Sequence, residues 1–299
     1  MTMKQKLVVI LGPTASGKTA LAHYLASVFR GELINADSRQ VYRKMDIGTA
    51  KATNNLQPTT YNAKMHLIDI KNPDERFTVA DYKKLAIQSI NEVIERKKLP
   101  ILVGGTGLYI KAIVENLEIP AIPVQEDLRA QLEKKTAEEL FLQLQRLDPQ
   151  AASRIDRYNK RRLARALEVI IVNGVFQAVK GEKIFDVLQI GIAVEKEELS
   201  SRIEKRVEEM LNQGLEKEVR ALVKKYRWTT VLATTIGYKE WKSLFDEEET
   251  IEQVKEEIIK NTQRYVKKQL TWFRADKTIH WIKQKNEAQR LVQKFLESS

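Results

Sequence analysis

One short stretch of the 299-residue chain has the residue types and spacing of a phosphate-binding loop. Residues 12–19 read Gly-Pro-Thr-Ala-Ser-Gly-Lys-Thr, which is the pattern G-x-x-x-x-G-K-T. In such a loop the glycines let backbone N–H groups turn toward an anion, and the helix that follows adds its positive N-terminus. The lysine reaches the outer phosphates, and the last threonine can ligate Mg²⁺. We therefore predict a diphosphate or triphosphate site at Gly12, Thr14, Ala15, Ser16, Gly17, Lys18 and Thr19.

An acidic side chain follows a second strand-like run. Residues 32–36 read Glu-Leu-Ile-Asn-Ala, and Asp37 and Ser38 come directly after them. Because ligands of open α/β sheets bind beyond the carboxyl ends of the strands, we expect Asp37 to project into the crevice of the phosphate loop. The alternative is that Asp37 or Ser38 caps a following helix, and sequence position alone does not decide between the two.

A third stretch has a glycine turn where many phosphate-binding enzymes carry an acidic residue. The apolar run 99–103 ends in Gly104-Gly105-Thr106-Gly107, whereas a typical P-loop NTPase places a Mg²⁺-binding Asp after such a strand. The missing carboxylate argues against an ordinary NTPase. Glycines allow a close backbone approach at this turn, and Thr106 supplies one hydroxyl. That hydroxyl orients Asp37 or a substrate, or else it caps the next helix.

The elements that must carry these residues predict an α/β fold. The phosphate loop lies between an apolar run at residues 7–11, typical of a buried parallel strand, and a helix-like run that begins near residue 20. Residues 78–97 have the apolar spacing of a helix, and residues 187–194 read as another strand. Further on, Gly214 is expected to separate two helices. We predict a P-loop NTPase-like parallel sheet core that is flanked by helices.

A change in composition indicates a second domain. A proline-containing run at residues 119–123 interrupts the α/β pattern, and the segment after it reads as helices with little strand signal. This segment is expected to be inserted between elements of the core. We predict a catalytic core formed by residues 1–120 plus 187–299, and a helical insertion domain at residues 121–186.

Positive charge is concentrated in two stretches of a chain whose formal net charge is +11, which favours a polyanionic partner. In residues 154–165, Arg157, Arg161 and Arg165 recur every four residues, so a helix would present them on one face suited to a phosphate backbone. A merely solvated face is the alternative. Residues 260–274 contain five basic residues, no acidic residue and interleaved aromatic side chains, as suits RNA binding.

The composition excludes several other kinds of site and protein. No cysteine is present, which excludes disulfides, thiolate metal sites and cysteine nucleophiles. Three scattered histidines do not have the spacing of a zinc site. No apolar stretch approaches the ~18 residues of a membrane span, and the N-terminus runs directly into the first predicted strand without a signal peptide. We therefore expect a cytoplasmic protein without a membrane partner.

Seven separated motifs, in order along the chain, resemble those of the tRNA dimethylallyltransferases, also called tRNA isopentenyltransferases. The resemblance covers nearly the whole chain and is far more specific than the phosphate loop alone. It implies a P-loop α/β core with a helical insertion, and transfer of a dimethylallyl group from dimethylallyl diphosphate to N6 of the adenosine just 3′ of the anticodon. The motifs are residues 12–19, 37–42, 45–51 and 104–109, Arg162 with residues 165–168, and residues 236–240 and 271–274.

The resemblance also implies roles for individual residues. The 12–19 loop would bind the diphosphate of an isoprenoid rather than ATP, with Mg²⁺ as cofactor and Thr19 as its ligand. Asp37 would be the general base, Thr106 its neighbour at the adenosine, and Arg206 a contact of the leaving diphosphate. We expect a monomer that binds the anticodon stem-loop of tRNA. The expected tRNA contacts are Asp37, Ser38, Arg39, Gln40, Thr106, Arg129, Arg161, Arg162 and Arg165, together with Arg264 and Lys268 from the basic C-terminal stretch.

Two other function classes explain fewer of these features. A P-loop small-molecule kinase of the nucleotide-kinase kind would use the loop and Asp37, but it leaves both basic stretches unexplained. A non-catalytic RNA-binding module with a degenerate nucleotide site would leave the intact Lys18-Thr19 pair unexplained. Labelled ATP and labelled dimethylallyl diphosphate, each incubated with tRNA, distinguish all three.

Overall fold

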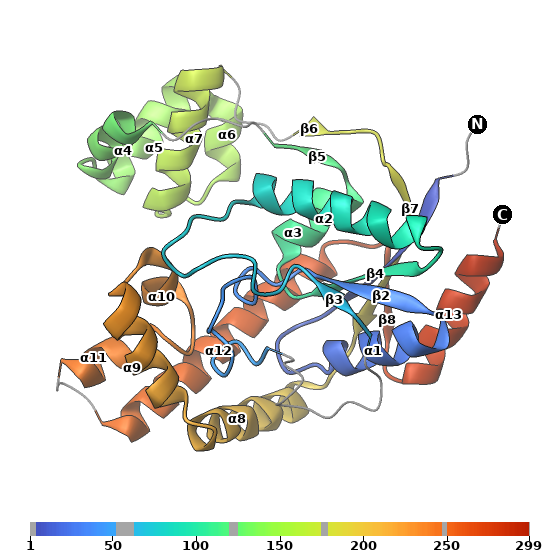
Figure 1. Cartoon of the computed structure of the whole chain (residues 1–299). Coiled ribbons are helices and arrows are strands. Elements are labelled where there is room, and N and C mark those ends of the chain that lie inside the picture. The colour runs from blue at the N-terminus through green and yellow to red at the C-terminus, as the bar shows by residue number, and fades with distance from the viewer. Residues whose placement is uncertain (1–3, 52–62, 120–124, 175–178, 247–249, 299) are drawn as a thin grey trace. The chain divides into compact units, whose positions relative to one another are not determined.

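The computed structural model describes residues 4–51, 63–119, 125–174, 179–246 and 250–298 (Figure 1). The chain divides into two compact units, of which one comprises Met1–Val114 with Lys183–Ser299 and the other Glu115–Glu182. We call the first unit the core and the second the insert. The core contains a parallel sheet with helices on its faces, so the predicted α/β class is confirmed. In the part of the chain that the structure describes, no helix is both long and apolar enough to cross a membrane.

A parallel sheet organises the core. Within the described residues its strand order is β3-β2-β4-β1-β7-β8, and every neighbouring pair runs parallel. Because β1 lies between β4 and β7, the loop after β1 leaves from the middle of the sheet's carboxyl edge. The bounds are β1 Gln5–Leu11, β2 Gly31–Asn35, β3 Met65–His66, β4 Leu99–Gly104, β7 Phe185–Ile192 and β8 Ile279–Ile282.

Alternating side chains of the buried strands hold helices on both faces of the sheet. On β1, Leu7 and Val9 belong to an apolar cluster with α2 and α3, whereas Val8 and Ile10 belong to a cluster with α1 and α13. This period of two is the expected result of burying both faces of a strand. The bounds are α1 Lys18–Val28, α2 Val79–Glu95, α3 Gly107–Val114 and α13 Lys285–Glu297.

A third apolar cluster joins the long helix α12 to helices that follow β7. Ile258 and Val266 of α12 pack in it with side chains of α8 and α9. Val41 and Met45, from the chain after β2, belong to the same cluster and tie that chain to these helices. Gly214, with φ of 92°, separates α8 from α9 as the sequence predicts. The bounds are α8 Lys196–Asn212, α9 Leu215–Tyr226, α10 Thr230–Thr234, α11 Trp241–Phe245 and α12 Ile251–Arg274.

The insert has an apolar centre of its own. Leu140 and Leu144 of α5 pack there against Leu163 and Leu167 of α7. Two short strands, β5 and β6, pair antiparallel. Residues 120–123 of the predicted boundary lie outside the described residues. The bounds are β5 Leu117–Glu118, α4 Glu126–Glu133, α5 Ala137–Leu147, α6 Pro149–Arg154, α7 Lys160–Asn173 and β6 Val179–Lys180.

The structure corrects the predicted arginine face of the insert. Helix α7 begins directly after Asn159, whose side chain accepts a backbone hydrogen bond from the first turn and caps the helix. Arg157 therefore precedes the helix, and its guanidinium lies 5.3 Å from the ring centroid of Phe141. The prediction that Arg157 shares a helical face with Arg161 and Arg165 is wrong, because the cap starts a new helix between them.

Candidate functional site

A small cavity of about 50 Å³ lies beyond the carboxyl ends of β1, β2 and β4 in the core. This is the edge at which open parallel sheets bind ligands. The structure brings Lys18 of the phosphate loop, Asp37 after β2 and Arg206 of α8 to this one cavity. Its lining residues are Thr14, Lys18, Thr19, Asn35, Asp37, Gln40, Thr49, Ala50, Met65, Val103, Gly104 and Arg206.

The phosphate loop joins β1 to α1 through left-handed backbone conformations. Gly17 has φ of 90°, and Ala15 adopts φ of 65°. Lys18 is the first residue of α1, so the N–H groups of the first helical turn have no intrahelical acceptor and are available to an anion. The Ser16 hydroxyl is buried and has no hydrogen-bond partner among the described residues. A bound anion is the kind of partner that these groups lack.

Gln269 of α12 joins the phosphate loop to the glycine turn after β4. Its side-chain oxygen accepts a 2.9 Å hydrogen bond from the N–H of Thr14, and its side-chain nitrogen donates at 2.8 Å to the carbonyl of Gly105. A Cβ added to Gly105 would lie 2.4 Å from that nitrogen, so the contact favours glycine. Sequence reasoning gave Gln269 no role, because an uncharged amide within a basic stretch carries no signal of its own.

Asp37 is held by local hydrogen bonds. Its N–H donates at 3.1 Å to the side-chain oxygen of Asn35, whose side-chain nitrogen donates at 3.2 Å to the Asp37 carbonyl. One carboxylate oxygen accepts the N–H of Arg39 at 2.8 Å. No helix occurs in residues 38–51, so the alternative reading of Asp37 or Ser38 as a helix cap is wrong. The carboxylate instead lines the cavity.

The hydroxyl of Thr106 lies beside the residue that follows Asp37. It accepts a 3.0 Å hydrogen bond from the N–H of Ser38, while the Thr106 carbonyl accepts an N–H from the first turn of α3. The phenol of Tyr265 on α12 lies near this hydroxyl. Burial, and then the negative charge of Asp37, raise the pKa of that phenol to about 12. Thr106 therefore lies between the segment that carries Asp37 and Ser38 and helix α12.

Two cations share the cavity with the Asp37 carboxylate. Burial lowers the pKa of Lys18 to about 8, with an opposing contribution from Asp37 and a further lowering from Arg206. Burial also lowers the pKa of Arg206. The Lys18 ammonium donates at 3.3 Å to the carbonyl of Pro13, and the Arg206 guanidinium donates at 3.4 Å to the carbonyl of Thr49. Two poorly hydrated cations beside one carboxylate favour an added anion.

The oxygen donors near Thr19 fit a magnesium ion that binds together with its anionic ligand. In the described part of the chain, no group of three or more His, Cys, Asp or Glu side chains could hold a metal by itself. The Thr19 hydroxyl and the Asp37 carboxylate line the same cavity. Mg²⁺ usually takes one or two protein oxygens and completes its shell with substrate phosphates and water. The donor set therefore suits Mg²⁺ with a diphosphate.

The predicted tRNA contacts of the core lie in two places. Arg39 and Gln40 follow Asp37; the Arg39 side chain donates at 3.3 Å to the Thr234 hydroxyl, and the Gln40 side chain donates at 3.1 Å to the Thr49 carbonyl. Arg264 and Lys268 lie four residues apart on α12 and are exposed. The first pair is fixed by protein contacts, while the second presents charge to solvent.

In the insert, two of the predicted arginines bind a buried carboxylate. Arg129 bonds both oxygens of Glu168 at 2.9 Å, and Arg165 bonds one of them at 2.8 Å. Glu168 is only 1% exposed. Burial alone would raise its pKa, yet the arginine hydrogen bonds outweigh burial and lower it to about 2. By contrast, Arg161 and Arg162 are exposed, and their side chains form no hydrogen bond or ion pair with any described residue.

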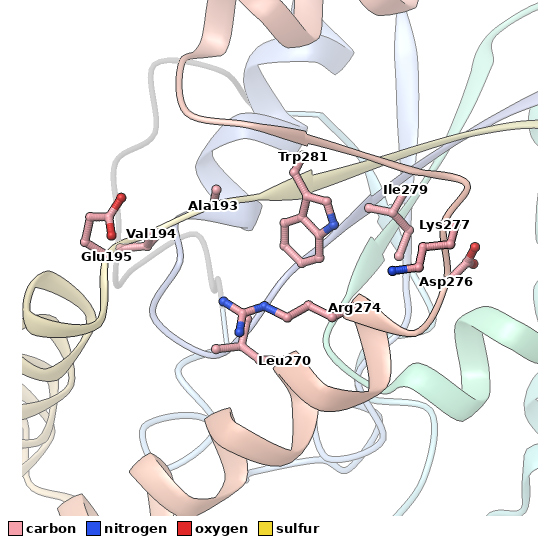
Figure 2. A pocket seen from close by; sticks show the side chains of 9 residues that line it. All are labelled: Ala193, Val194, Glu195, Leu270, Arg274, Asp276, Lys277, Ile279 and Trp281. Carbon is pink, nitrogen blue, oxygen red and sulfur yellow. The ribbon is translucent and has the colours of Figure 1, made fainter.

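A larger cavity of about 500 Å³ lies elsewhere in the core and is lined by none of the predicted site residues (Figure 2). Arg274 and Trp281 point into it, and Lys277 and Asp276 lie side by side in its lining. Asp276 is already bonded by Gln189 at 3.0 Å. The phosphate loop, Asp37 and Arg206 thus meet at the smaller cavity, and size alone does not identify the site.

Comparisons with known proteins point to one family. The family model described as IPP transferase matches residues 40–276. A protein named tRNA dimethylallyltransferase from Anoxybacillus flavithermus is 40% identical over 285 residues, covering 94% of this chain and 91% of the relative. One of the same name from Geobacter sulfurreducens is 42% identical over 290 residues, covering 93% and 92%.

Solved structures with this fold carry related names. A tRNA isopentenylpyrophosphate transferase from Bacillus halodurans is 38% identical, with a TM-score of 0.73 over 98% of this chain and 96% of that one. A eukaryotic dimethylallyltransferase described as acting on tRNA is 26% identical, with a TM-score of 0.74 over 90% of this chain and 70% of its own. Sequence and fold similarity therefore agree.

Proposed function

The chain belongs to the IPP transferase family, and we propose that it transfers a dimethylallyl group from dimethylallyl diphosphate to N6 of the adenosine 3′ of the anticodon in tRNA. Its class, a prenyltransferase that acts on tRNA, follows from relatives that are 40% identical over 94% of the chain. One observation most strongly supports the specific reaction with dimethylallyl diphosphate and N6 of adenosine. Lys18, Asp37 and Arg206 line a single cavity at the strand ends.

The phosphate loop and Arg206 suit a leaving diphosphate. The allylic C–O bond breaks as the C–N bond forms, so negative charge develops on the leaving oxygen. We infer that the N–H groups at the start of α1, the Lys18 ammonium and the Arg206 guanidinium stabilise that charge, which is supported by their position at the carboxyl edge of the sheet. Because no phosphoryl group is transferred, the reaction does not need the acidic residue that NTPases carry where β4 ends in Gly104.

Asp37 suits the role of general base toward adenosine. The exocyclic amine of adenine is a weak nucleophile, since its lone pair is delocalised into the ring, and it must lose a proton as the new bond forms. A carboxylate within hydrogen-bond reach accepts that proton. Thr106 fixes the backbone after Asp37 through Ser38. The target base must leave its stack in the anticodon loop to reach this carboxylate.

Mg²⁺ is the proposed cofactor, with the Thr19 hydroxyl as its protein ligand. When bound, the ion neutralises charge on the diphosphate. The chain's own part is to orient the diphosphate with the loop amides and to hold Lys18 and Arg206 against it.

The proposed tRNA contacts are of two kinds, a segment that contacts nucleotides near the target base and charged surfaces that contact backbone phosphates. Residues 38–40 adjoin Asp37 and are suited to the nucleotides around the target base. Arg161 and Arg162 of the insert and the exposed cations of α12 are suited to backbone phosphates. Arginines on a helix do not reach bases in the deep major groove of an RNA stem, so these contacts give affinity rather than sequence selection.

A donor-exchange experiment tests the proposal. The protein is incubated with bulk tRNA and either dimethylallyl diphosphate labelled in the prenyl group or γ-labelled ATP, and the RNA is then isolated and digested to nucleosides. We expect label from the prenyl donor in a modified adenosine and no label from ATP. ATP hydrolysis or phosphoryl transfer to a small molecule, with no prenyl label in tRNA, would favour the P-loop kinase instead.

A further inference from the structure

We propose that Glu218 of α9 is a positioning residue for the diphosphate site, although it does not line the cavity. It acts through the loop at residues 46–50, whose Thr49 carbonyl holds Arg206 and Gln40. This inference rests on the proposed function and adds a residue to it. It also gives a role to the motifs at residues 45–51 and 236–240, which the chemistry described above leaves unused.

The Glu218 carboxylate binds successive backbone amides of one loop. One of its oxygens accepts the N–H groups of Asp46 at 3.1 Å and Ile47 at 2.8 Å. The other accepts the N–H of Gly48 at 3.1 Å and the phenol O–H of Tyr238 at 2.7 Å. Four donors on one carboxylate, from two segments distant in the chain, fix the path of the loop.

The far end of this loop forms a wall of the cavity. Thr49 and Ala50 line it together with Arg206 and Gln40. The Thr49 carbonyl accepts hydrogen bonds from the Arg206 guanidinium at 3.4 Å and from the Gln40 amide at 3.1 Å. The carbonyl thus orients the cation proposed for the leaving diphosphate. Its own position depends on the turn that Glu218 holds.

Packing and a second set of charges hold the same loop. A Cβ added to Gly48 would lie 2.5 Å from the Tyr238 ring, so the ring and the loop can meet only at glycine. The fully buried Lys51 side chain donates to the carboxylates of Asp46 and Asp69, at 2.6 Å each. The loop is therefore an ordered wall, and the Glu218 carboxylate is the group that binds its backbone donors.

A carboxylate is needed for this contact, because each of its oxygens accepts at least one backbone N–H, a group that can only donate. In Glu218→Gln one acceptor oxygen becomes an NH₂ group that faces N–H or O–H donors, and the loop must move. Hydrogen bonds to a charged group contribute enough that the loss should weaken binding of inorganic diphosphate about tenfold. Glu216→Gln is the matched control, since Glu216 lies in the same helix and, among the residues that the structure describes, its side chain bonds only Arg220, at 2.7 Å.

The experiment titrates inorganic diphosphate by calorimetry into wild type, Glu218→Gln and Glu216→Gln, with circular dichroism to confirm that each variant is folded. A double-mutant cycle with Arg206→Ala separates positioning from general destabilisation. If Glu218 acts through Arg206, the Glu218→Gln change should cost less than about twofold once Arg206 is absent. Should Glu218→Gln fail to fold, Tyr238→Phe keeps the ring on Gly48, removes one of the four donors and is expected to weaken binding in the same direction.

Two results would overturn the inference: unchanged diphosphate binding in folded Glu218→Gln, or equal losses with and without Arg206. Prenyl transfer to tRNA by the wild type is measured in parallel. A wild type without transfer activity would count against the proposed function, whereas the diphosphate titrations decide the role of Glu218 in either case.

Discussion

The backbone N–H of Ser38 donates a 3.0 Å hydrogen bond to the hydroxyl oxygen of Thr106. This contact joins the chain after β2 to the chain after β4, directly beside Asp37. A Cβ added to Gly104 would lie 2.2 Å from the Ala36 carbonyl oxygen, so the two strand ends can approach this closely only with glycine there. Gly104, which stands where an NTPase carries its acidic residue, thus lets the end of β4 pack closely against the chain that leads to Asp37, the proposed base.

Removal of the Thr106 hydroxyl should slow transfer without preventing folding. Thr106→Val keeps the side-chain shape but leaves the Ser38 N–H without its acceptor, so we expect the single-turnover rate to fall about tenfold. Thr106→Ser retains the hydroxyl and should remain within a few-fold of wild type. Equal rates for the valine and serine variants would show that the hydrogen bond does not position Asp37.

Binding of the prenyl donor should weaken as the pH rises through the lowered pKa of Lys18. In the free protein that pKa is about 8, so Lys18 is charged below pH 8 and must take up a proton to meet the diphosphate above it. Affinity for dimethylallyl diphosphate without tRNA should therefore be nearly flat below pH 8 and fall above it. Lys18→Arg, which stays charged, should flatten the curve in calorimetric titrations from pH 7 to 9.5; a wild-type profile that is flat up to pH 9.5 contradicts this.

The pair Arg129 and Glu168 should stabilise the insert in a pH-dependent way. Folding lowers the pKa of Glu168 from 4.5 to about 2, so its stabilising contribution is complete above pH 4.5 and is lost as the pH falls toward 2. Arg129→Met leaves a buried carboxylate with one partner fewer, and we expect a loss of about 1–3 kcal/mol at pH 7. Urea unfolding should show this loss shrinking between pH 4.5 and pH 3. A loss of unfolding free energy that does not change with pH would instead show that Arg129 stabilises the insert through packing of its side chain.

Arg161 and Arg162 should contribute to tRNA binding mainly through counterion release. Their exposed side chains form no hydrogen bond or ion pair within the described chain, so the double change to alanine should leave stability unaltered. The plot of log affinity for tRNA against log salt concentration should become less steep. For each arginine, the change should correspond to the loss of up to about one phosphate contact. Lys294→Ala on α13, exposed and outside every predicted contact, is the control. Slopes that match wild type would mean that this surface is only solvated.

Local features of the fold could be predicted because they depend on neighbours in sequence. The phosphate loop follows a buried strand, and the helix predicted within residues 78–97 is observed as α2. Gly214 takes the positive φ that ends a helix. Arg157 shows the limit of this reasoning: a four-residue period predicts a common face only if no cap intervenes, and Asn159 supplies one.

The contacts that assemble the site could not be predicted from local pattern. Gln269 bonds Thr14 across 255 positions of sequence, and Glu218 bonds Ile47 across 171. Neither side chain has a spacing or a type that signals its partner. Arg129 shows a different case, because a basic residue predicted to contact tRNA also bonds the buried carboxylate of Glu168. Its charge in the sequence gives no sign of this partner.

The most direct test of the proposed mechanism is the single-turnover rate of prenyl transfer to saturating tRNA for wild type and Asp37→Ala, with tRNA affinity measured on both. General-base removal typically costs about 10²–10⁴-fold, so we expect a loss of that size in the rate, with tRNA affinity largely retained. Digestion of the wild-type product should give an adenosine that carries the dimethylallyl group on N6. An Asp37→Ala rate within a few-fold of wild type, or a prenyl group on another atom, would contradict the mechanism proposed for this site.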